Sequence, residues 1–315
     1  MRILFCALVL AAYATAQPVI GAAGYSSPTP LPVAPGQIIS LFVQNISGPA
    51  PSVSDVSAVF HQNSDIPMPV LNVQAICAVP GETCAATIRG ITVQIPYGIQ
   101  TLCPLCANPL LPSGYITVSI HGVSSGPLGV QPLADQVHFL TQCDVFIGNP
   151  VSLNNGGLPC APMITHADGT MVSATKPASS GEELVAYATG LGETNPPLTT
   201  GKPAPAASPT QTVFSIDFDY RPNALATKPP PVPTGEGIGL TLWELGPPLF
   251  TGATAGFIGL YQINFVVPPA PAGLPPCVDT TTLPPGANVV QSNLTVSVGS
   301  NFSFDGAGIC VQPGS

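Results

Sequence analysis

Charged side chains are scarce in this chain, and positively charged ones are the scarcest. Asp, Glu, Lys and Arg make up 7% of its 315 residues, against roughly 25% in ordinary soluble domains. The chain has 6 Lys and Arg residues against 15 Asp and Glu residues, a net charge of -9. Because the basic residues stand singly, they do not form the positive patch that nucleic-acid binding requires. The sequence therefore argues against a nucleic-acid partner.

Long apolar runs and helical periodicity are also missing. The 40 prolines and 32 glycines interrupt the apolar segments before they reach the length of about 18 residues that a membrane-spanning helix needs. Beyond the first 16 residues, no segment of about a dozen residues repeats its apolar positions with the helical period. We therefore expect no transmembrane segment in the mature chain.

The N-terminus has the residue order of a secretory signal peptide. Arg2 supplies a positive charge, an apolar segment follows, and the small residues at 14–16 precede Gln17. We expect cleavage after Ala16. Cys6 lies within the apolar segment rather than just after the cleavage site, so a lipid anchor is not expected. The mature protein is predicted to be secreted or held at the cell surface.

Short apolar runs separated by Pro- and Gly-rich turns predict β-strands. In one of them, Phe214, Ile216 and Phe218 alternate with polar residues, as in a strand with one buried face. The candidate strands span residues 37–43, 86–95, 115–121, 183–189, 213–220, 239–244, 259–267 and 293–298. The expected fold class is all-β, built of sandwiches or barrels.

Three strand-sized motifs occur twice in the same order. "APGQIISLFVQNISGPAP" resembles "SSGEELVAYATGLGETNPP", "ITVQIPYGI" resembles "YQINFVVPPAP", and "YITVSIHG" resembles "NLTVSVGS". The offset between copies grows along the chain, so the second copy contains insertions, and the Pro-rich residues 223–237 are the expected loop. Each copy is long enough for its own core. We predict two tandem domains, residues 17–142 and 143–315, with the junction near residues 140–151.

The second copy also resembles a known family. The segments "DGTMVSATKPASSGEELVAYATGLGETNPPLTTGKPAP", "GFIGLYQINFVVPPAPAG" and "NLTVSVGS" are similar to the Solibacter-type C-terminal domain, which recurs in secreted proteins of acidobacteria. The resemblance covers residues 164–312, and the first half resembles a diverged copy. It implies a bacterial protein of two tandem immunoglobulin-like β-sandwich domains. It brings no catalytic residues and no assigned biochemical role.

The cysteines indicate disulfide bonds. The chain has 9 cysteines, and removal of Cys6 with the signal peptide leaves an even number, as is typical of disulfide-bonded exported proteins. Closeness along the sequence favours four pairs, although other connectivities are possible. The expected pairs are Cys77–Cys84, Cys103–Cys106, Cys143–Cys160 and Cys277–Cys310.

Three motifs resemble catalytic loops but lack the surroundings that the chemistry needs. "GLGETN" at residues 190–195 resembles a phosphate loop, but Pro196 and Pro197 follow and prevent a helix from starting there. We interpret it as a turn that ends a strand. Cys103 and Cys106 have the spacing of a redox or zinc motif, but their proline-broken setting favours a structural bridge. "GVSSG" at residues 122–126 matches a nucleophile elbow without the required helix.

The remaining polar residues form no recognisable site by their spacing. The histidines are isolated and are interpreted as surface or strand residues; they are His61, His121, His138 and His166. Asp217 and Asp219 share a strand face, and we expect that face to be solvated because no calcium loop accompanies them. N-glycosylation patterns begin at Asn45, Asn293 and Asn301, and a bacterial protein is expected to leave them unused. We predict no catalytic, cofactor-binding or metal-binding residues.

The sequence predicts a module that recognises another molecule and does not catalyse a reaction. Its partner would be an extracellular protein or a glycan such as an envelope polysaccharide, bound by loops at the ends of the sandwiches. Aromatic residues for a sugar platform are few, and the single tryptophan, Trp243, has a core-like setting. Two alternatives stay open: a hydrolase of extracellular polymers with a site between the domains, and a self-associating adhesion or sheath protein.

Overall fold

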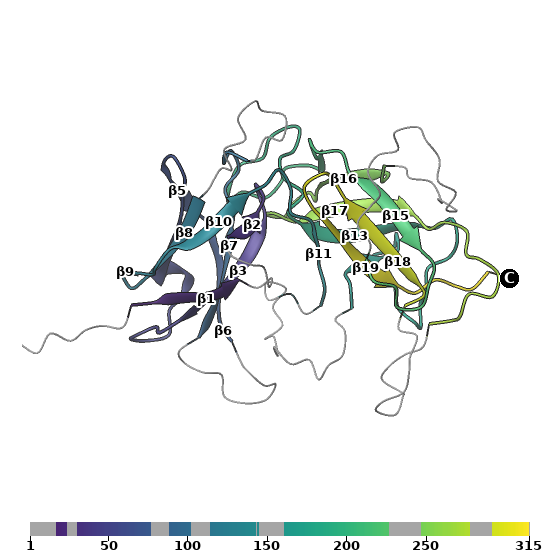
Figure 1. The fold of residues 1–315 in the computed structure, drawn as a ribbon, viewed down its shortest axis with the longest axis horizontal. Coiled ribbons are helices and arrows are strands. Elements are labelled where there is room, and N and C mark those ends of the chain that lie inside the picture. The colour runs from purple at the N-terminus through teal and green to yellow at the C-terminus, as the bar shows by residue number, and fades with distance from the viewer. Residues whose placement is uncertain are drawn as a thin grey trace, which may run out of the picture.

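The computed structural model describes residues 17–23, 30–76, 88–101, 114–142, 144, 161–226, 247–277 and 292–314. These residues form β-strands in four sheets (Figure 1). A single-turn 3-10 helix, η1 (Val53–Asp55), interrupts them, and the described residues contain no α-helix. The structure confirms the all-β fold class.

The N-terminal half, by which we mean the described residues up to 133, contains two sheets. One is antiparallel throughout and has the strand order β1 (Val19–Ala23), β3 (Ile38–Gln44), β7 (Arg89–Gln94), β6 (Val70–Ala75). The other has the order β2 (Leu31–Val33), β10 (Leu128–Pro132), β8 (Gly114–Ile120), β4 (Val56–His61), β5 (Asp65–Met68), and β9 (Val123–Ser124) pairs with β8. Only the β2–β10 pair in this sheet is parallel.

The C-terminal half, the described residues from 137 onward, also contains two sheets. One has the order β11 (His138–Phe139), β13 (Glu183–Thr189), β17 (Tyr261–Val266), β16 (Phe250–Ala253), β14 (Ser208–Pro209), and β12 (Ile164–Thr165) pairs with β13. The other has the order β15 (Ser215–Asp219), β18 (Leu294–Gly299), β19 (Phe304–Ile309). A parallel bridge joins Ala178 to Val311, just after β19.

The central strands of the two halves pair in the same order. β3 and β7 form the centre of their sheet, as β13 and β17 do in theirs. β1 pairs with β3, while β11 and β12 together take the same place beside β13. In the other sheets, β8 lies between β4 and β10, and β18 lies between β15 and β19. In the N-terminal half, β2, which precedes β3, pairs in parallel with the last strand, β10. In the C-terminal half, Ala178, which precedes β13, forms a parallel bridge with Val311, just after the last strand, β19. The three repeated motifs therefore fall on strands at corresponding places in the two halves.

Each half encloses its own hydrophobic core between its two sheets. In the N-terminal half, Phe60 and Ile116 of one sheet pack with Ile91 of the other. In the C-terminal half the core includes Leu184 and Val296. Each fully buried side chain of this size stabilises the fold by about 1.5–3 kcal/mol. The chain thus has two separate cores.

Seven of the eight predicted strands are present, and the eighth, at residues 239–244, lies outside the described residues. The predicted alternation at residues 213–220 is confirmed. Phe214 and Ile216 are buried in the C-terminal core, and Phe218 and Tyr220 pack against it. The polar residues between them point away from this core, because successive side chains of a strand face opposite ways.

The change from one core to the other falls before residue 142, where the predicted first domain ends. Val130 belongs to the N-terminal core, whereas Val137 and Phe139 already belong to the C-terminal core. β11 accordingly pairs with β13 of the C-terminal half. Residues 134–136 connect the two halves, and we call them the connector.

Candidate functional site at the junction of the two halves

The glycine turn after β13 holds the connector. Gly190 and Gly192 have φ angles of 79° and 82°, which favour glycine over other residues. A Cβ atom on Gly190 would lie 1.9 Å from the carbonyl oxygen of Gln136, and one on Gly192 would lie 2.1 Å from that of Ala134. The Gln136 N–H donates to the Gly190 carbonyl at 2.7 Å. The motif that resembles a phosphate loop is therefore a turn, as predicted, and it docks the connector.

A third glycine brings the two halves into direct contact. Gly259, with φ of 60°, precedes β17, and a Cβ atom on it would lie 2.6 Å from the Ile38 side chain and 2.7 Å from the Gly36 carbonyl oxygen. Beside it, the hydroxyl of buried Thr189 accepts from the Ile38 N–H at 2.9 Å and donates to the Gly259 carbonyl at 3.2 Å. The start of β3 thus packs against the end of β13.

Two tyrosines continue this contact. The buried Tyr261 hydroxyl donates to the Gly192 carbonyl at 2.6 Å and lies 3.1 Å from the Tyr97 hydroxyl of the other half. Burial raises the pKa of Tyr261 well above its usual value, and the nearby Tyr97 raises it further. Both hydroxyls therefore stay protonated. The adjoining Gly98 N–H donates to the Glu193 carboxylate at 2.9 Å.

His138 lies at the same junction, between two carboxylates. Its Nε2 is 3.0 Å from Asp144 Oδ1, and its Nδ1 is 3.3 Å from Asp305 Oδ2. Burial opposes protonation, but the hydrogen bonds and charges of Asp144 and Asp305 outweigh it and raise the pKa of His138 to about 9. The ring is therefore an imidazolium at neutral pH, with both N–H groups directed at carboxylates, so it lacks the lone pair that a general base needs.

The connector is also bonded to the turn between β18 and β19. The carboxylate of fully buried Asp135 accepts from the Ser300 hydroxyl at 2.7 Å and from the Ser303 hydroxyl at 2.5 Å. The Ser303 hydroxyl also accepts from the Val137 N–H at 2.8 Å. Burial raises the pKa of Asp135, and the two serine hydrogen bonds oppose that rise. This network fixes the path of the chain from one half to the other.

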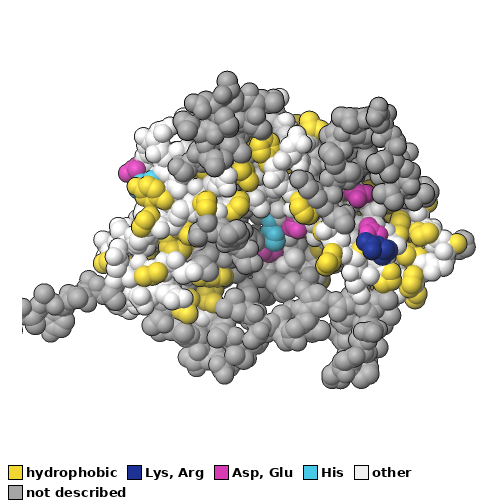
Figure 2. Space-filling model, in the orientation of Figure 1, with side chains coloured by type: hydrophobic (Ala, Val, Ile, Leu, Met, Phe, Trp, Pro, Cys, Tyr) yellow, Lys and Arg dark blue, Asp and Glu magenta, His cyan; other side chains and the backbone are white. Residues whose placement is uncertain are grey.

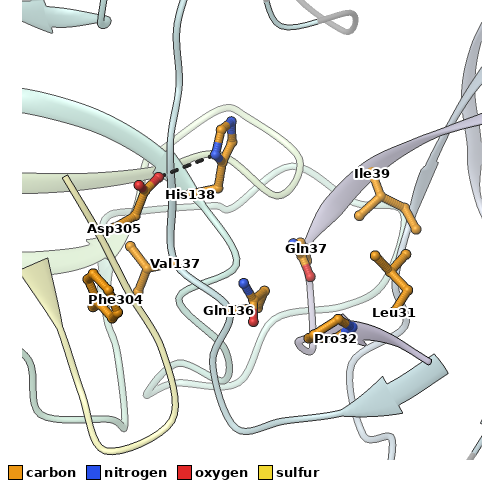
Figure 3. A pocket seen from close by; sticks show the side chains of 9 residues that line it. All are labelled: Leu31, Pro32, Gln37, Ile39, Gln136, Val137, His138, Phe304 and Asp305. Carbon is orange, nitrogen blue, oxygen red and sulfur yellow. Dashed lines mark ion pairs between the residues drawn. The ribbon is translucent and has the colours of Figure 1, made fainter. Parts of the chain in front are cut away.

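A pocket of about 190 Å³ lies beside this network. Figure 3 shows Leu31, Pro32, Gln37 and Ile39 on one side of it and Val137, Phe304 and Asp305 on the other, with Gln136 between them. The charged groups in its lining are His138 and Asp305, which are bonded to each other. The pocket thus has room for a small polar molecule and presents two amide side chains to it.

A larger pocket, of about 560 Å³, lies in the C-terminal half. Ile216 and Phe218 of β15 face Phe265 of β17 in its lining, together with prolines at 247, 248, 268 and 269. Among the described residues, its lining carries no titratable side chain and forms an apolar groove.

The serines of the "GVSSG" motif have structural partners. Ser124 lies on β9, and its hydroxyl is 2.6 Å from that of Ser119 on β8. The buried Ser125 hydroxyl accepts from the Val118 N–H at 3.0 Å and donates to the Gly126 carbonyl at 2.9 Å. The motif forms a hairpin with β8. It is not a strand-to-helix elbow.

The other histidines are distributed over both halves, and two of them have carboxylate partners. His166 is buried and bonds to Glu182 and to the Lys176 carbonyl. His61 bonds to Asp65, at the edge of the N-terminal half. His61 and His138 lie on strands β4 and β11, as interpreted from the sequence. Their partners Asp65 and Asp144 are only 4 and 6 residues away along the chain, whereas Glu182 is 16 residues from His166. His121 is exposed and lies 3.2 Å from the Pro49 carbonyl oxygen.

The two predicted aspartates, Asp217 and Asp219, have different surroundings in the structure, and so do the three asparagines of the glycosylation patterns. Asp219 is paired with Arg221, while Asp217 is partly buried and burial raises its pKa. Asn293 is fully buried, and its side chain bonds to the backbone of Val311 in both directions. It is therefore a structural residue. The other two asparagines, at 45 and 301, are exposed.

The structure joins Cys277 to Cys310, the fourth of the expected pairs, with their Cα atoms 5.6 Å apart. The other expected disulfide residues lie outside the described residues; they are Cys77, Cys84, Cys103, Cys106, Cys143 and Cys160. Trp243 also lies outside them.

Sequence reasoning did not identify the junction network. Asp305 is far from His138 along the chain, and Asp135 looks like an ordinary turn residue. The spacing of His138 and Asp144 was a weak signal. The glycine turn was the strongest one, although it indicates close backbone approach and not chemistry.

No protein-family model matches this chain, and no curated protein matches it. Within the described part of the chain, no group of three or more His, Cys, Asp or Glu side chains could hold a metal ion. No helix among the described residues is long and apolar enough to cross a membrane.

Proposed function

We propose that this protein is a secreted or cell-surface recognition module that acts by binding and not by catalysis. The observation that carries the proposal is the junction, where three glycines and buried hydrogen bonds hold two β-sheet units against each other. Such a joint presents the surfaces of both units in a fixed relative orientation. A fixed orientation favours binding, because less conformational freedom is lost when the partner docks.

The strand order supports an immunoglobulin-like assignment for both halves. In such sandwiches the first, second, fifth and fourth strands form one sheet in the order A-B-E-D, and C, F and G form the other. Taking β1, β3, β4, β6, β7, β8 and β10 as A to G reproduces this order, with β2 as an added strand beside G. β11 with β12, then β13 and β15 to β19, reproduce it in the second half.

Export is the second part of the proposal. It is supported by the signal-like N-terminal order of residues and by the disulfide between Cys277 and Cys310, since such bonds persist in oxidising compartments. The resemblance to the Solibacter-type C-terminal domain points the same way. Two tandem domains of this type, stapled by disulfides, would present loops and sheet faces outside the cell.

A hydrolase site between the domains is the less supported alternative. Carboxylates do gather at the junction, as such a site would require, and His138 lies among them. However, both ring nitrogens of His138 bond to carboxylates, and the Asp135 carboxylate is held by two serines. These groups fix the connector, which accounts for their positions without catalysis.

A pull-down with the mature chain, residues 17–315, tests the proposal. The immobilised protein would be incubated with separate fractions of bacterial envelope polysaccharide, peptidoglycan and envelope protein, and scanned for hydrolysis of each polymer. Specific retention of one fraction without polymer cleavage is expected. Cleavage that depends on His138 or Asp305 would instead establish the hydrolase. Concentration-dependent sedimentation of the protein alone, with no fraction retained, would favour a self-associating adhesion or sheath protein.

A further inference from the structure

We propose that the outer face of the sheet formed by β2, β10, β8, β4 and β5 binds a neutral polysaccharide, with Tyr115 as the residue on which a sugar ring stacks. This inference rests on the proposed recognition function and names its ligand class. It places the binding surface on a sheet face of the N-terminal half, away from the loops and from the junction.

The geometry of this face is set by one row of side chains across four strands. Gly129, Tyr115, His61 and Asp65 are cross-strand partners on β10, β8, β4 and β5. Their alternate neighbours, such as Ile116 and Phe60, are buried in the core, so this row faces outward. Tyr115 is 43% exposed, which is high for a large side chain in the middle of a sheet.

His61 holds the Tyr115 ring upright. The two rings are stacked with their centroids 4.4 Å apart and their planes 14° apart. His61 is itself fixed at both nitrogens, by Asp65 at 2.6 Å and by the Thr117 hydroxyl at 2.8 Å. His61 covers one face of the Tyr115 ring and holds the ring in place. The opposite face is therefore turned toward β10.

That opposite face looks onto a gap above Gly129. Neighbouring strands lie about 4.8 Å apart, and the strand partner of Tyr115 on β10 has no side chain. A Cβ atom built on Gly129 would meet no described atom within 4 Å. The described residues thus leave the position above Gly129 open beside Tyr115, and we call this open position the slot. A pyranose ring presents a flat set of C–H groups that packs on such a face.

The side chains around the slot match a neutral, hydroxyl-rich ligand. Thr117 and Ser119 point the same way as Tyr115 on β8, and Ser57 does so on the neighbouring β4. Gln131 is two residues after Gly129 on β10. The five strands carry no Lys or Arg, and their acidic residue, Asp65, is paired with His61. In Figure 2, acidic and histidine side chains adjoin at the end of the molecule where β5 lies, and the basic side chains seen on the described residues lie over the C-terminal half. A phosphate or sulfate ligand would find no counter-charge here.

A sugar fits this face better than a peptide does. The backbone N–H and C=O groups of β8 and β4 are already paired within the sheet, so a peptide strand could not pair beside Tyr115. It could extend the sheet only at its terminal strands, β2 and β5. Hydroxyl and amide side chains, in contrast, both donate and accept, as sugar hydroxyls do. The slot, the Tyr115 ring and the hydroxyl side chains of Ser57, Thr117 and Ser119 together favour a polysaccharide chain lying across the sheet.

Affinity electrophoresis of the mature chain tests this proposal. Native gels would contain dextran, galactomannan, hydroxyethyl cellulose or mixed-linkage β-glucan. Retarded migration is expected in at least one of these gels. Tyr115→Ala should weaken the retardation constant about tenfold or more, the loss expected for one stacking contact of ~1.4 kcal/mol. Gly129→Val should have a similar effect, because its side chain fills the slot, and valine suits a strand.

The matched control is Phe257→Ala, which removes an exposed aromatic residue of the C-terminal half and should leave the retardation unchanged. Gly129→Val keeps Tyr115 and His61 in place, so it tests the slot even if Tyr115→Ala fails to fold. The proposal is overturned if the wild-type chain migrates freely in all four gels, or if Gly129→Val binds as well as wild type. Envelope protein retained in the pull-down alongside free migration would leave the recognition function standing and remove only the glycan assignment.

Discussion

At the scale of single residues, glycine sets how closely the two halves approach. Gly190 has a φ of 79°, and its missing Cβ leaves room for the Gln136 carbonyl. Gly190→Ala should therefore lower the free energy of unfolding by about 3 kcal/mol. Part of the loss comes from placing alanine in a left-handed backbone conformation, and the rest comes from displacing the connector. Urea unfolding followed by circular dichroism measures this loss.

Gly169 supplies the matched control for that substitution. Its φ is 81°, but a Cβ atom there would meet nothing within 4 Å. Gly169→Ala should cost only about 1 kcal/mol, the backbone contribution alone. Equal losses for the two variants would show that the contact with the connector contributes nothing.

His138 makes the stability of the junction depend on pH. Its pKa is raised to about 9 in the folded protein, while about 6.5 is usual in an unfolded chain. A group whose pKa is raised on folding stabilises the fold fully below the unfolded pKa and loses that effect as the pH rises through the folded pKa. The free energy of unfolding should thus fall by about 2–3 kcal/mol between pH 6.5 and pH 9.

The measurement is urea unfolding across that pH range for wild type, His138→Gln and His121→Gln. The decline should be absent in His138→Gln and retained in His121→Gln, since His121 is exposed and lies away from the junction. A decline of the same size in all three proteins would assign the pH dependence to other groups. The buried tyrosines do not contribute in this range, because burial raises the pKa of both Tyr97 and Tyr261 above the usual value.

At the scale of elements, a disulfide ties the loop before β18 to the end of β19. Cys277 and Cys310 are 33 residues apart along the chain, and closing a loop of that length restricts the unfolded chain by about 3–4 kcal/mol. The double variant Cys277→Ala and Cys310→Ala should lose about that much stability in non-reducing urea titrations. A loss below about 1 kcal/mol would mean that the unfolded chain is already restricted at this place.

Several longer strands could be predicted from the sequence, but β4, β6 and β19, of six residues each, were missed. The shortest strands could not be predicted. β13 has the predicted bounds because seven residues of apolar periodicity identify a strand without help from neighbours. β11, β12 and β14 have two residues each, too few to show a period, and they are strands only because a partner supplies their hydrogen bonds. β4 alternates buried and more exposed residues, but polar residues follow it, so the sequence pattern does not mark where the strand ends.

The same reasoning explains why the candidate sites escaped prediction. The partners of Tyr115 are His61 and Gly129, which become neighbours only when the strand register is known. His138 likewise meets Asp305 through the pairing of β11 with β13 and the packing of β19 nearby. Composition indicated few aromatics, and the structure places one of them where its ring is held upright and exposed. Position, and not number, decides whether an aromatic residue can serve a binding face.

At the scale of the whole molecule, the junction should make the two halves unfold together. Buried bonds cross it, including those of Thr189 with Ile38 and of Tyr261 with Tyr97. Unfolding one half would break these bonds and expose their polar groups to water, at a net cost of about 0.5–1.5 kcal/mol for each bond. We therefore expect a single calorimetric transition for the mature chain, although tandem units joined by weak contacts commonly show two.

Gly259→Val tests this coupling by adding a side chain at the contact between the two halves. The added side chain would collide with Ile38 and with the Gly36 carbonyl of the N-terminal half, so it should push the halves apart and split the transition into two. Gly256→Val is the control, because Gly256 also has a positive φ but faces open space within the described residues. It should lower the transition temperature without splitting the transition. If Gly259→Val keeps one transition while wild type and control do the same, the halves are coupled by something other than this contact. If wild type already shows two transitions, the halves are independent, and a fixed relative orientation cannot be the basis of recognition.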